Sequence, residues 1–230
     1  VFVDSMSDLF HEDVPDAHID RVFATMLACE LFENRTSHTF QVLTKRAERM
    51  ADYMNAPPAE LLERWGKAGD GSIIVGDGDT YFSEAVYSHC VARWGDAGIA
   101  TEPTAPWKRP ENLFPLRNVW MGVSCGTREH GLPRLDHLRR VPAVVRFVSF
   151  EPLLEDLGEV NLDGISWAIT GAESGHRARR MEEAWVRSLR DQCERAGVAF
   201  FYKQRLDGRK KVSLPLLDGV QHAAWPEVSP

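Results

Sequence analysis

Six short apolar runs alternate along this chain with longer segments whose apolar residues recur at helical spacing. The runs cover residues 1–3, 39–43, 118–123, 144–150, 165–169 and 198–202. They are rich in β-branched and aromatic residues, which is typical of buried strands. Helices are predicted at about 15–33, 46–54, 132–140 and 182–195. This alternation predicts a parallel sheet with helices packed outside it, an α/β fold.

Each predicted strand ends in polar residues, most clearly the run at 165–169, which stops in Thr170, Gly171, Ala172 and Glu173. The carboxyl ends of parallel strands meet at one edge, where such folds place their ligand sites. The residues expected at this edge are Ser5, Ser7, Asp8, Thr44, Lys45, Ser124, Glu151, Glu173, Ser174, Lys203 and Gln204. Lysines and carboxylates facing one cavity suit a charged small ligand or a base extruded from a nucleic acid.

Two of these strand ends also have a purely structural interpretation. The residues at 4–8 are typical of a capped turn that leads into a helix. Lys45 and Arg46 could hold a carboxylate or a phosphate, or they could form the solvated start of a helix. The sequence leaves both pairs of alternatives open.

Six strands are too few to close an eight-stranded barrel, so the sequence predicts an open, partial (β/α) barrel. One domain spanning residues 1–230 is expected, with 55–114 as an insertion or lid because glycine and proline punctuate it. Helices are predicted within it near 58–67 and 81–94. Its GDGDT segment resembles part of a calcium loop but lacks the remaining ligands, so we expect no metal there.

Composition and charge narrow the possible partners. A net charge of −7 argues against a generic nucleic-acid coat protein. Basic residues are nevertheless concentrated at Arg177, Arg179 and Arg180 and again along 205–211, where they could contact phosphates or form a solvated face. No apolar run approaches the roughly 20 residues that cross a bilayer, and no signal peptide is visible, so we expect a cytoplasmic protein with no membrane contact.

The four cysteines are widely separated and form no CxxC pair, which argues against a zinc ribbon or a redox motif. We expect buried free thiols, with the exception of Cys125, which lies at a strand end.

Several long blocks carry a resemblance to a known family. VFVDSMSDLFH, FQVLTKRAERM, NVWMGVSC, LRRVPAVVRFVSFEPLLEDLG, ISWAITGAESG, RRMEEAWVRSLRDQCERAGVAFFYKQ and LPLLDG occur in this order. Together they resemble a phage protein family that is widespread in mycobacteriophages and bacterial prophages. That family is itself similar to radical S-adenosylmethionine enzymes, including spore photoproduct lyase.

The resemblance implies a partial barrel, like that of radical S-adenosylmethionine and TIM-barrel enzymes, with a [4Fe–4S] cluster and S-adenosylmethionine at the carboxyl ends of its strands. Reductive cleavage would give a radical that takes hydrogen from a substrate. The implied cofactor-binding residues are Ser5, Met6, Ser7, Asp8, Thr44, Lys45, Ser124, Gly171 and Ser174. The implied catalytic residues are Glu151, Glu173 and Lys203. The implied substrate or phosphate contacts are Arg177, Arg179, Arg180 and Gln204.

One family feature is missing from this sequence. No three-cysteine motif is present, and the family would place it upstream of Val1. The chain as given is therefore expected not to assemble the cluster by itself.

Three functions follow from these observations. The first is a radical S-adenosylmethionine-like enzyme domain that modifies a nucleic-acid base or a nucleotide. The second is a non-catalytic phage barrel protein that binds a partner or has a structural role. The third is a metal-free lyase or aldolase that uses Lys45 or Lys203 as a Schiff base. The sequence does not specify the oligomeric state.

Overall fold

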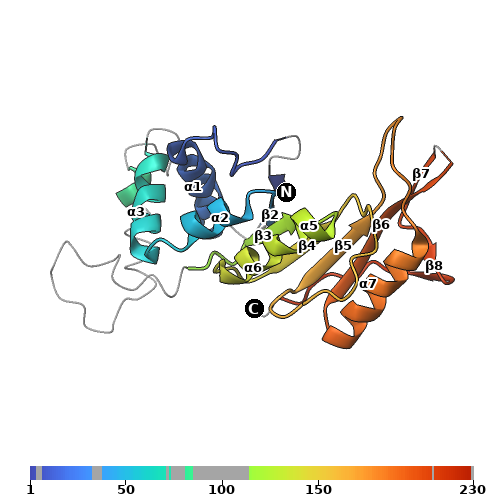
Figure 1. Cartoon of the computed structure of the whole chain (residues 1–230). Helices are drawn as coiled ribbons and strands as arrows, with labels where there is room; N and C mark the ends of the chain where they lie inside the picture. The colour runs from blue at the N-terminus through green and yellow to red at the C-terminus, as the bar shows by residue number, and fades with distance from the viewer. Residues whose placement is uncertain are drawn as a thin grey trace.

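The computed structural model of the chain describes residues 1–3, 7–32, 38–70, 73, 81–84, 114–208 and 210–228 (Figure 1). The strands are β1 (Phe2–Val3), β2 (Phe40–Thr44), β3 (Val119–Ser124), β4 (Arg146–Phe150), β5 (Trp167–Gly171), β6 (Ala199–Asp207), β7 (Lys210–Ser213), β8 (Leu216–Leu217) and β9 (Val220–Gln221). The helices are α1 (Asp16–Phe32), α2 (Ala47–Met54), α3 (Pro58–Gly69), α5 (Arg128–Gly131), α6 (Pro133–Arg140) and α7 (Glu183–Ala196).

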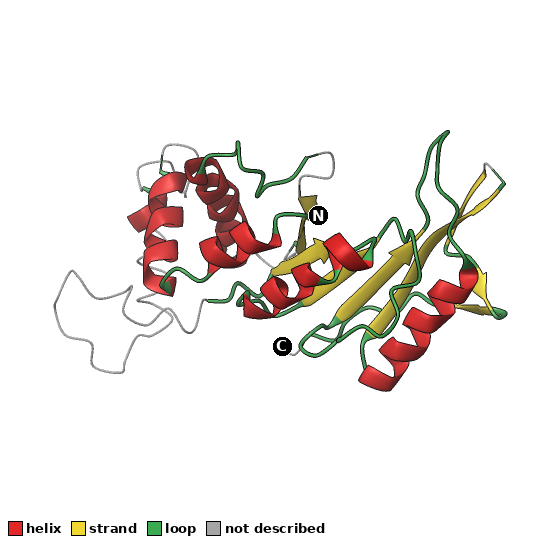
Figure 2. Ribbon diagram, viewed as in Figure 1, coloured by secondary structure: helices red, strands yellow, loops and turns green. Residues whose placement is uncertain are grey.

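The main sheet follows the chain, in the order β1-β2-β3-β4-β5-β6-β7. Neighbours from β1 to β6 are parallel, and β7 is antiparallel to β6. The sheet curls into a half-barrel, and the helices α5, α6 and α7 lie over one of its faces (Figure 2). The predicted α/β class and open parallel sheet are therefore confirmed. The antiparallel β7 was not predicted.

Alternation along the strands gives the sheet two different faces. One face packs on the helices and forms the larger core, which includes Val42, Val148 and Tyr202. The opposite, concave face carries an aromatic cluster made of Trp120, Phe147, Trp167, Ile169 and Trp225, with Phe201 partly buried beside it. We call this cluster the aromatic floor.

Close packing of the floor requires a glycine in the middle of β3. A Cβ atom at Gly122 would lie 2.4 Å from the Phe147 ring, which pairs with it across the strands. Trp225, from the end of the chain, completes the floor. Its ring stacks on Trp167 at 4.6 Å, and the Trp167 indole N–H donates to the Ala224 carbonyl at 2.9 Å.

A buried polar network joins α1, α2 and α3. The Tyr53 hydroxyl donates to Asp20 at 2.6 Å and accepts from the Trp65 indole N–H at 2.8 Å. Arg64 completes the network with a 2.9 Å bond to Asp20. Burial and the neighbouring Asp20 carboxylate raise the pKa of Tyr53 far above its usual range, so its hydroxyl stays protonated. The network thus ties three helices into one layer beside the sheet.

The region predicted as an insertion or lid begins with α3. This helix confirms the prediction near 58–67 and packs on α1, where the Trp65 and Phe23 rings stack at 4.8 Å. The helix predicted near 81–94 lies outside the described residues except at 81–84, of which 82–84 are helical. Among the helices that the structure describes, none is both long enough and apolar enough to span a membrane.

Replacing Tyr53 with phenylalanine tests the helical network. The Tyr53→Phe variant keeps the ring but leaves the Trp65 N–H without its acceptor and Asp20 with one donor fewer. We expect the free energy of unfolding to fall by about 1–3 kcal/mol, measured by urea denaturation. Tyr81→Phe is the matched control, because Tyr81 is 63% exposed. Equal stability of the two variants would contradict this role for the network.

Candidate functional site

An ion pair lies at the carboxyl edge of the concave face. Glu151 directly follows β4 and lies beside Gly171, because Phe150 pairs with Thr170. The Lys203 ammonium approaches the two Glu151 carboxylate oxygens at 3.1 and 3.2 Å, and the Ser149 hydroxyl donates to the same carboxylate at 3.3 Å. The Glu151 side chain is 13% exposed and that of Lys203 is 52% exposed. The pair thus has a mostly buried, anchored anion and a half-exposed cation.

Gly171 makes room for this pair. A Cβ atom there would lie 2.7 Å from a Glu151 carboxylate oxygen. The pairing of β5 with β6 shifts at this point, so that Thr170 faces Tyr202 but Gly171 faces Gln204. The extra residue in β6 is Lys203. The buried Gln204 side chain donates to the Ala172 carbonyl at 2.7 Å and holds the irregular register.

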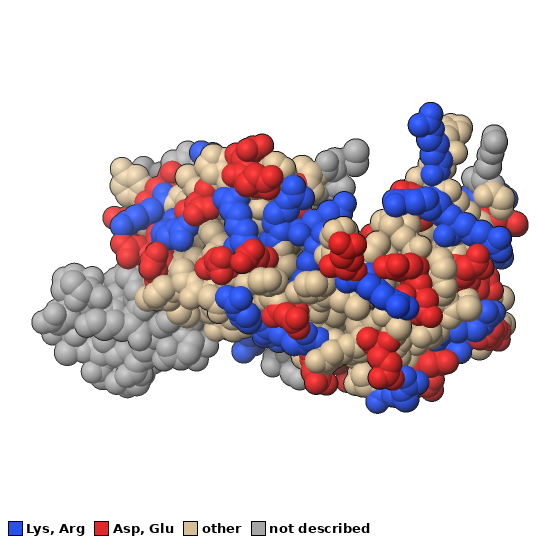
Figure 3. Space-filling model, viewed as in Figure 1, with Lys and Arg blue, Asp and Glu red and all other residues tan. Residues whose placement is uncertain are grey.

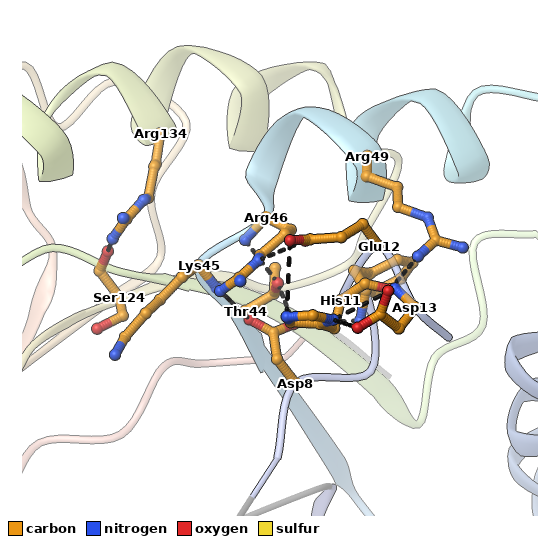
Figure 4. Close-up of polar contacts among 11 residues, drawn as sticks. Asp8, His11, Glu12, Asp13, Thr44, Lys45, Arg46, Arg49, Ser124 and Arg134 are labelled. Atoms are coloured by element: carbon orange, nitrogen blue, oxygen red, sulfur yellow. Dashed lines mark hydrogen bonds and ion pairs between the residues drawn. The ribbon is translucent and has the colours of Figure 1, made fainter. Parts of the chain in front are cut away.

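Ser124 and Lys45 extend the polar edge across β3 and β2. The Ser124 hydroxyl donates to the Glu151 carbonyl at 3.2 Å, and Arg134 donates to the Ser124 carbonyl at 2.6 Å. Burial lowers the pKa of Arg134. Lys45 follows Thr44, whose partner is Val123, so it lies beside Ser124 at the strand ends. Figure 4 shows its side chain extending toward Ser124 and away from Asp8.

Asp8 and Thr44 form a clasp that joins the first loop to the end of β2. The Asp8 carboxylate accepts bonds from the Thr44 hydroxyl at 2.5 Å, the Lys45 backbone N–H at 2.9 Å and the Phe10 N–H at 3.1 Å (Figure 4). Both side chains therefore already have partners within the chain. Of the other residues in the first loop that the resemblance implies as cofactor-binding, Ser7 is exposed, and Ser5 and Met6 lie outside the described residues.

The loop after β5 carries a second closed pair. Glu173 accepts from the Arg179 guanidinium through both of its oxygens, each at 2.8 Å, and from the Arg179 backbone N–H. These bonds lower the pKa of Glu173 to about 2. Arg180 pairs with Glu182 at 2.9 Å. Ser174 and Arg177 are exposed on the same loop. Both carboxylate oxygens of Glu173 are thus occupied by its own loop partner.

A small basic cavity of about 340 Å³ opens beside the clasp. Its charged lining residues are Glu12, Lys45, Arg46, Glu48, Arg49, Arg134 and His137. Arg46 pairs with Glu12 at 3.3 Å and Arg49 with Asp16 at 2.8 Å. Lys45 makes no ion pair with any residue that the structure describes. It is therefore the cation at this edge that is free to meet a ligand.

The cysteines that the structure describes, Cys29, Cys125 and Cys193, belong to no metal-ligand group. Burial raises the pKa of Cys125 and of Cys193 to about 12, so both stay protonated near neutral pH. Across the described ranges, no three His, Cys, Asp or Glu residues are grouped as metal ligands. Cys90 lies outside these ranges.

Three contributors to the concave face were not predicted. Ser149 lies between Phe147 and Glu151 on the same face of β4, and alternation along VRFVSFE could have identified it. Trp120 and Trp225 form part of the floor. No local sequence pattern predicts that Trp225, which is distant in sequence from β3 and β5, packs against the sheet.

Fold and site together define an α/β half-barrel protein with an ion pair at the carboxyl edge of its sheet. Comparison with family models places it further: residues 1–226 match the family described as "Protein of unknown function (DUF5131)", and the chain belongs to that family. No curated protein and no solved structure matches the chain.

The Glu173–Arg179 pair predicts a measurable shift in one titration. A lowered carboxyl pKa means that the pair stabilises the loop above pH 4.5 and is lost as the pH falls from 4.5 to about 2. Arg179→Gln should raise the Glu173 pKa from about 2 toward 4.5, read from carbon-13 shifts of the side-chain carboxyl. Arg177→Gln serves as the control and should leave the pKa unchanged. An unchanged Glu173 pKa in Arg179→Gln would show that the pair does not form in solution.

Removing the Asp8 carboxylate tests the clasp. Asp8→Ala leaves the Thr44 hydroxyl and two backbone N–H groups without an acceptor, and should lower the free energy of unfolding by about 2–4 kcal/mol. Asp13→Ala is the control, since the Asp13 side chain is 90% exposed. Chemical denaturation of both variants gives the comparison. A loss in Asp8→Ala no greater than in the control would leave Asp8 available as a ligand contact instead.

Proposed function

We propose that the concave face binds a ligand of the S-adenosylmethionine class, which joins an α-amino acid group to a nucleoside. In this proposal the chain is part of a radical S-adenosylmethionine-like enzyme that modifies a nucleic-acid base or a nucleotide. The resemblance supplies the identity of the cofactor and the reaction class. The observation that carries the proposal is the Glu151–Lys203 pair above Gly171.

An α-amino acid group matches this pair in charge, because it carries one ammonium and one carboxylate. Its ammonium can bond to Glu151 while its carboxylate bonds to Lys203, so each protein charge exchanges one partner for another. Because no unpaired charge is buried, the exchange avoids the large cost of isolating an ion in the protein. Glu151 is held by Ser149 and can stay in place, while the half-exposed Lys203 side chain can move aside to admit the ligand.

The surroundings of the pair favour the same ligand class. Ser124 lies at the neighbouring strand end and offers a hydroxyl to a ribose, and Lys45 offers a further cation beyond it. Below the pair, Ile169 and the aromatic floor exclude water from the underside of the site. Low water content strengthens the charged contacts that the ligand would make. A zwitterion with a polar sugar therefore suits the edge better than a purely apolar ligand.

The two cofactors implied by the resemblance fit the described residues differently. S-adenosylmethionine has candidate partners for its ammonium, carboxylate and hydroxyl groups. The cluster needs three thiolates together, and among the described residues no such group exists. The role of this chain in the proposal is accordingly to bind and orient the nucleoside ligand.

A non-catalytic binding module is the second candidate. The observation that favours it is that Asp8, Thr44 and Glu173, three residues implied for cofactor or catalysis, are already bonded within the chain. In this case the concave face binds its ligand and releases it chemically unchanged.

Calorimetric titration with S-adenosylmethionine tests the proposal. Glu151→Gln and Lys203→Met each remove one charged partner, and each should weaken binding by about 10- to 100-fold. Glu129→Gln and Lys67→Met are matched controls at exposed positions and should bind like the wild type. The proposal fails if the wild type does not bind S-adenosylmethionine or if all four variants bind equally.

Separation of the two candidates needs one further measurement. Because the chain has no three-cysteine motif, the [4Fe–4S] cluster is supplied on a separate peptide that carries one. The wild-type chain is incubated anaerobically with this peptide, a reductant and S-adenosylmethionine, and free methionine is measured. Release of methionine supports the enzyme, and intact recovery of bound S-adenosylmethionine supports the binding module.

A further inference from the structure

A second cavity, of about 600 Å³, opens on the helical face of the sheet, opposite the concave face that carries the Glu151–Lys203 pair. It lies between the loop after β5 and the β6–β7 hairpin, which both rise beyond the end of the sheet in Figure 1. Ala172 and Tyr202 line it, and they directly adjoin Gly171 and Lys203 in sequence. Because neighbouring residues of a strand point to opposite faces, this cavity is separate from the Glu151–Lys203 pair.

Two residues that line this cavity, Tyr202 and Arg205, carry buried hydrogen-bond donors without a partner among the described residues. Tyr202 is fully buried, and its hydroxyl bonds to no described residue. The Nε atom of Arg205 is buried and likewise without a partner. Thr170 pairs with Tyr202 across the strands, and its hydroxyl is also buried and has no hydrogen-bond partner among the described residues. Buried polar groups are nearly always bonded, so three orphans in neighbouring positions indicate a site built to bond a ligand.

The Tyr202 hydroxyl is protonated and can donate a hydrogen bond. Burial, with a smaller contribution from Glu183, raises the pKa of its hydroxyl to about 12. The hydroxyl therefore keeps its proton across the physiological range. Arginine is always charged, so Arg205 donates as well.

Charge around the cavity leaves one cation available. Glu182 is paired with Arg180, and Glu183 with Arg187 at 3.1 Å. Arg179 is occupied by Glu173. Arg205 makes no ion pair with any residue in the described part of the chain. Figure 3 shows further Lys and Arg side chains on the raised loop after β5 and around its base.

The start of α7 adds to the preference for an anion. Glu182, the residue before α7, and Glu183, its first residue, both line the cavity. The Glu182 side chain makes no bond to the N–H groups of the first turn. The helix dipole favours a negative group at this end of a 14-residue helix. Met181 and Leu206 give the same cavity an apolar side.

We propose that this cavity binds an organic phosphate, with the phosphate bonded to Tyr202, Arg205 and the first turn of α7 and the organic part against Met181 and Leu206. The proposal is independent of the ligand on the concave face. The phosphate can belong to a free nucleotide or to a nucleic-acid strand, since the cavity recognises the group that both share.

Calorimetry with inorganic phosphate and then with adenosine 5′-monophosphate tests the site on the full chain. We expect saturable binding of phosphate by the wild type, with a Kd on the order of 1 mM or tighter. Arg205→Gln should weaken it by on the order of 10-fold, because one charged hydrogen-bond donor is lost. Tyr202→Phe should weaken it by about 3- to 10-fold.

Arg195→Gln is the matched control, an identical change at an exposed position near the other end of α7, and it should bind phosphate like the wild type. Tyr202→Phe should keep or raise the melting temperature, because it removes a polar atom that has no partner in the protein. That result would separate a binding loss from a folding loss. The proposal is overturned if the wild type shows no saturable binding, or if Arg205→Gln binds phosphate as tightly as Arg195→Gln does.

Two further probes distinguish the sources of the phosphate. Adenosine 5′-monophosphate that binds more tightly than a single-stranded oligonucleotide without terminal phosphates identifies a nucleotide site. The reverse order identifies a strand site. Whichever probe binds more tightly, Arg205→Gln must weaken its binding. The proposal is overturned if this variant weakens the binding of neither adenosine 5′-monophosphate nor the oligonucleotide.

Discussion

The alternation of side chains along parallel strands is the constraint on which this structure depends. Each strand must bury one row of residues against the helices, so the other row is left to line the concave face. Because paired residues lie side by side, the register of the strands arranges this row in layers across the sheet. Phe147 and Trp167 are paired in one layer, Ser124, Ser149 and Ile169 form the next, and Glu151 lies one step beyond them, beside Gly171. Gly122 and Gly171 are small because the neighbouring strand places Phe147 and Glu151 over them.

Polar groups at the carboxyl edge divide into those used by the fold and those left for a ligand. Asp8 holds the first loop on β2, and its three accepted bonds leave little capacity for a further donor. Glu173 is held by Arg179 in the same way. Glu151 differs, because its principal partner is the half-exposed and flexible side chain of Lys203. A surface-exposed lysine contact contributes little stability, so a ligand can replace it at low cost. This difference in partner, more than the identity of the acidic residue, separates Glu151, for which we propose a ligand, from the two structural carboxylates.

The sequence predicted the order and the type of the main elements well. The strand expected at 165–169 is found at Trp167–Gly171, and the helix expected at 182–195 is found at Glu183–Ala196. These features follow from local periodicity. The clasp between Asp8 and Thr44 could not be predicted in this way, since its partners are 36 residues apart. The strand β7 was missed because its lysines have the composition of a basic, solvated run, and only the edge of β6 gives them a partner.

The register shift between β5 and β6 explains how one strand end serves both faces of the sheet. Without the shift, Lys203 would pair with Gly171, and the alternation of side chains along β6 would continue unchanged. With it, Gly171 faces Gln204, and Lys203 is released from the ladder to reach Glu151. Gln204 then bonds to the Ala172 carbonyl, and Ala172 in turn lines the cavity on the helical side. Such irregularities re-aim side chains where a regular ladder would not. The shift thus sets the position of the ion pair on one face and of the neighbouring cavity wall on the other.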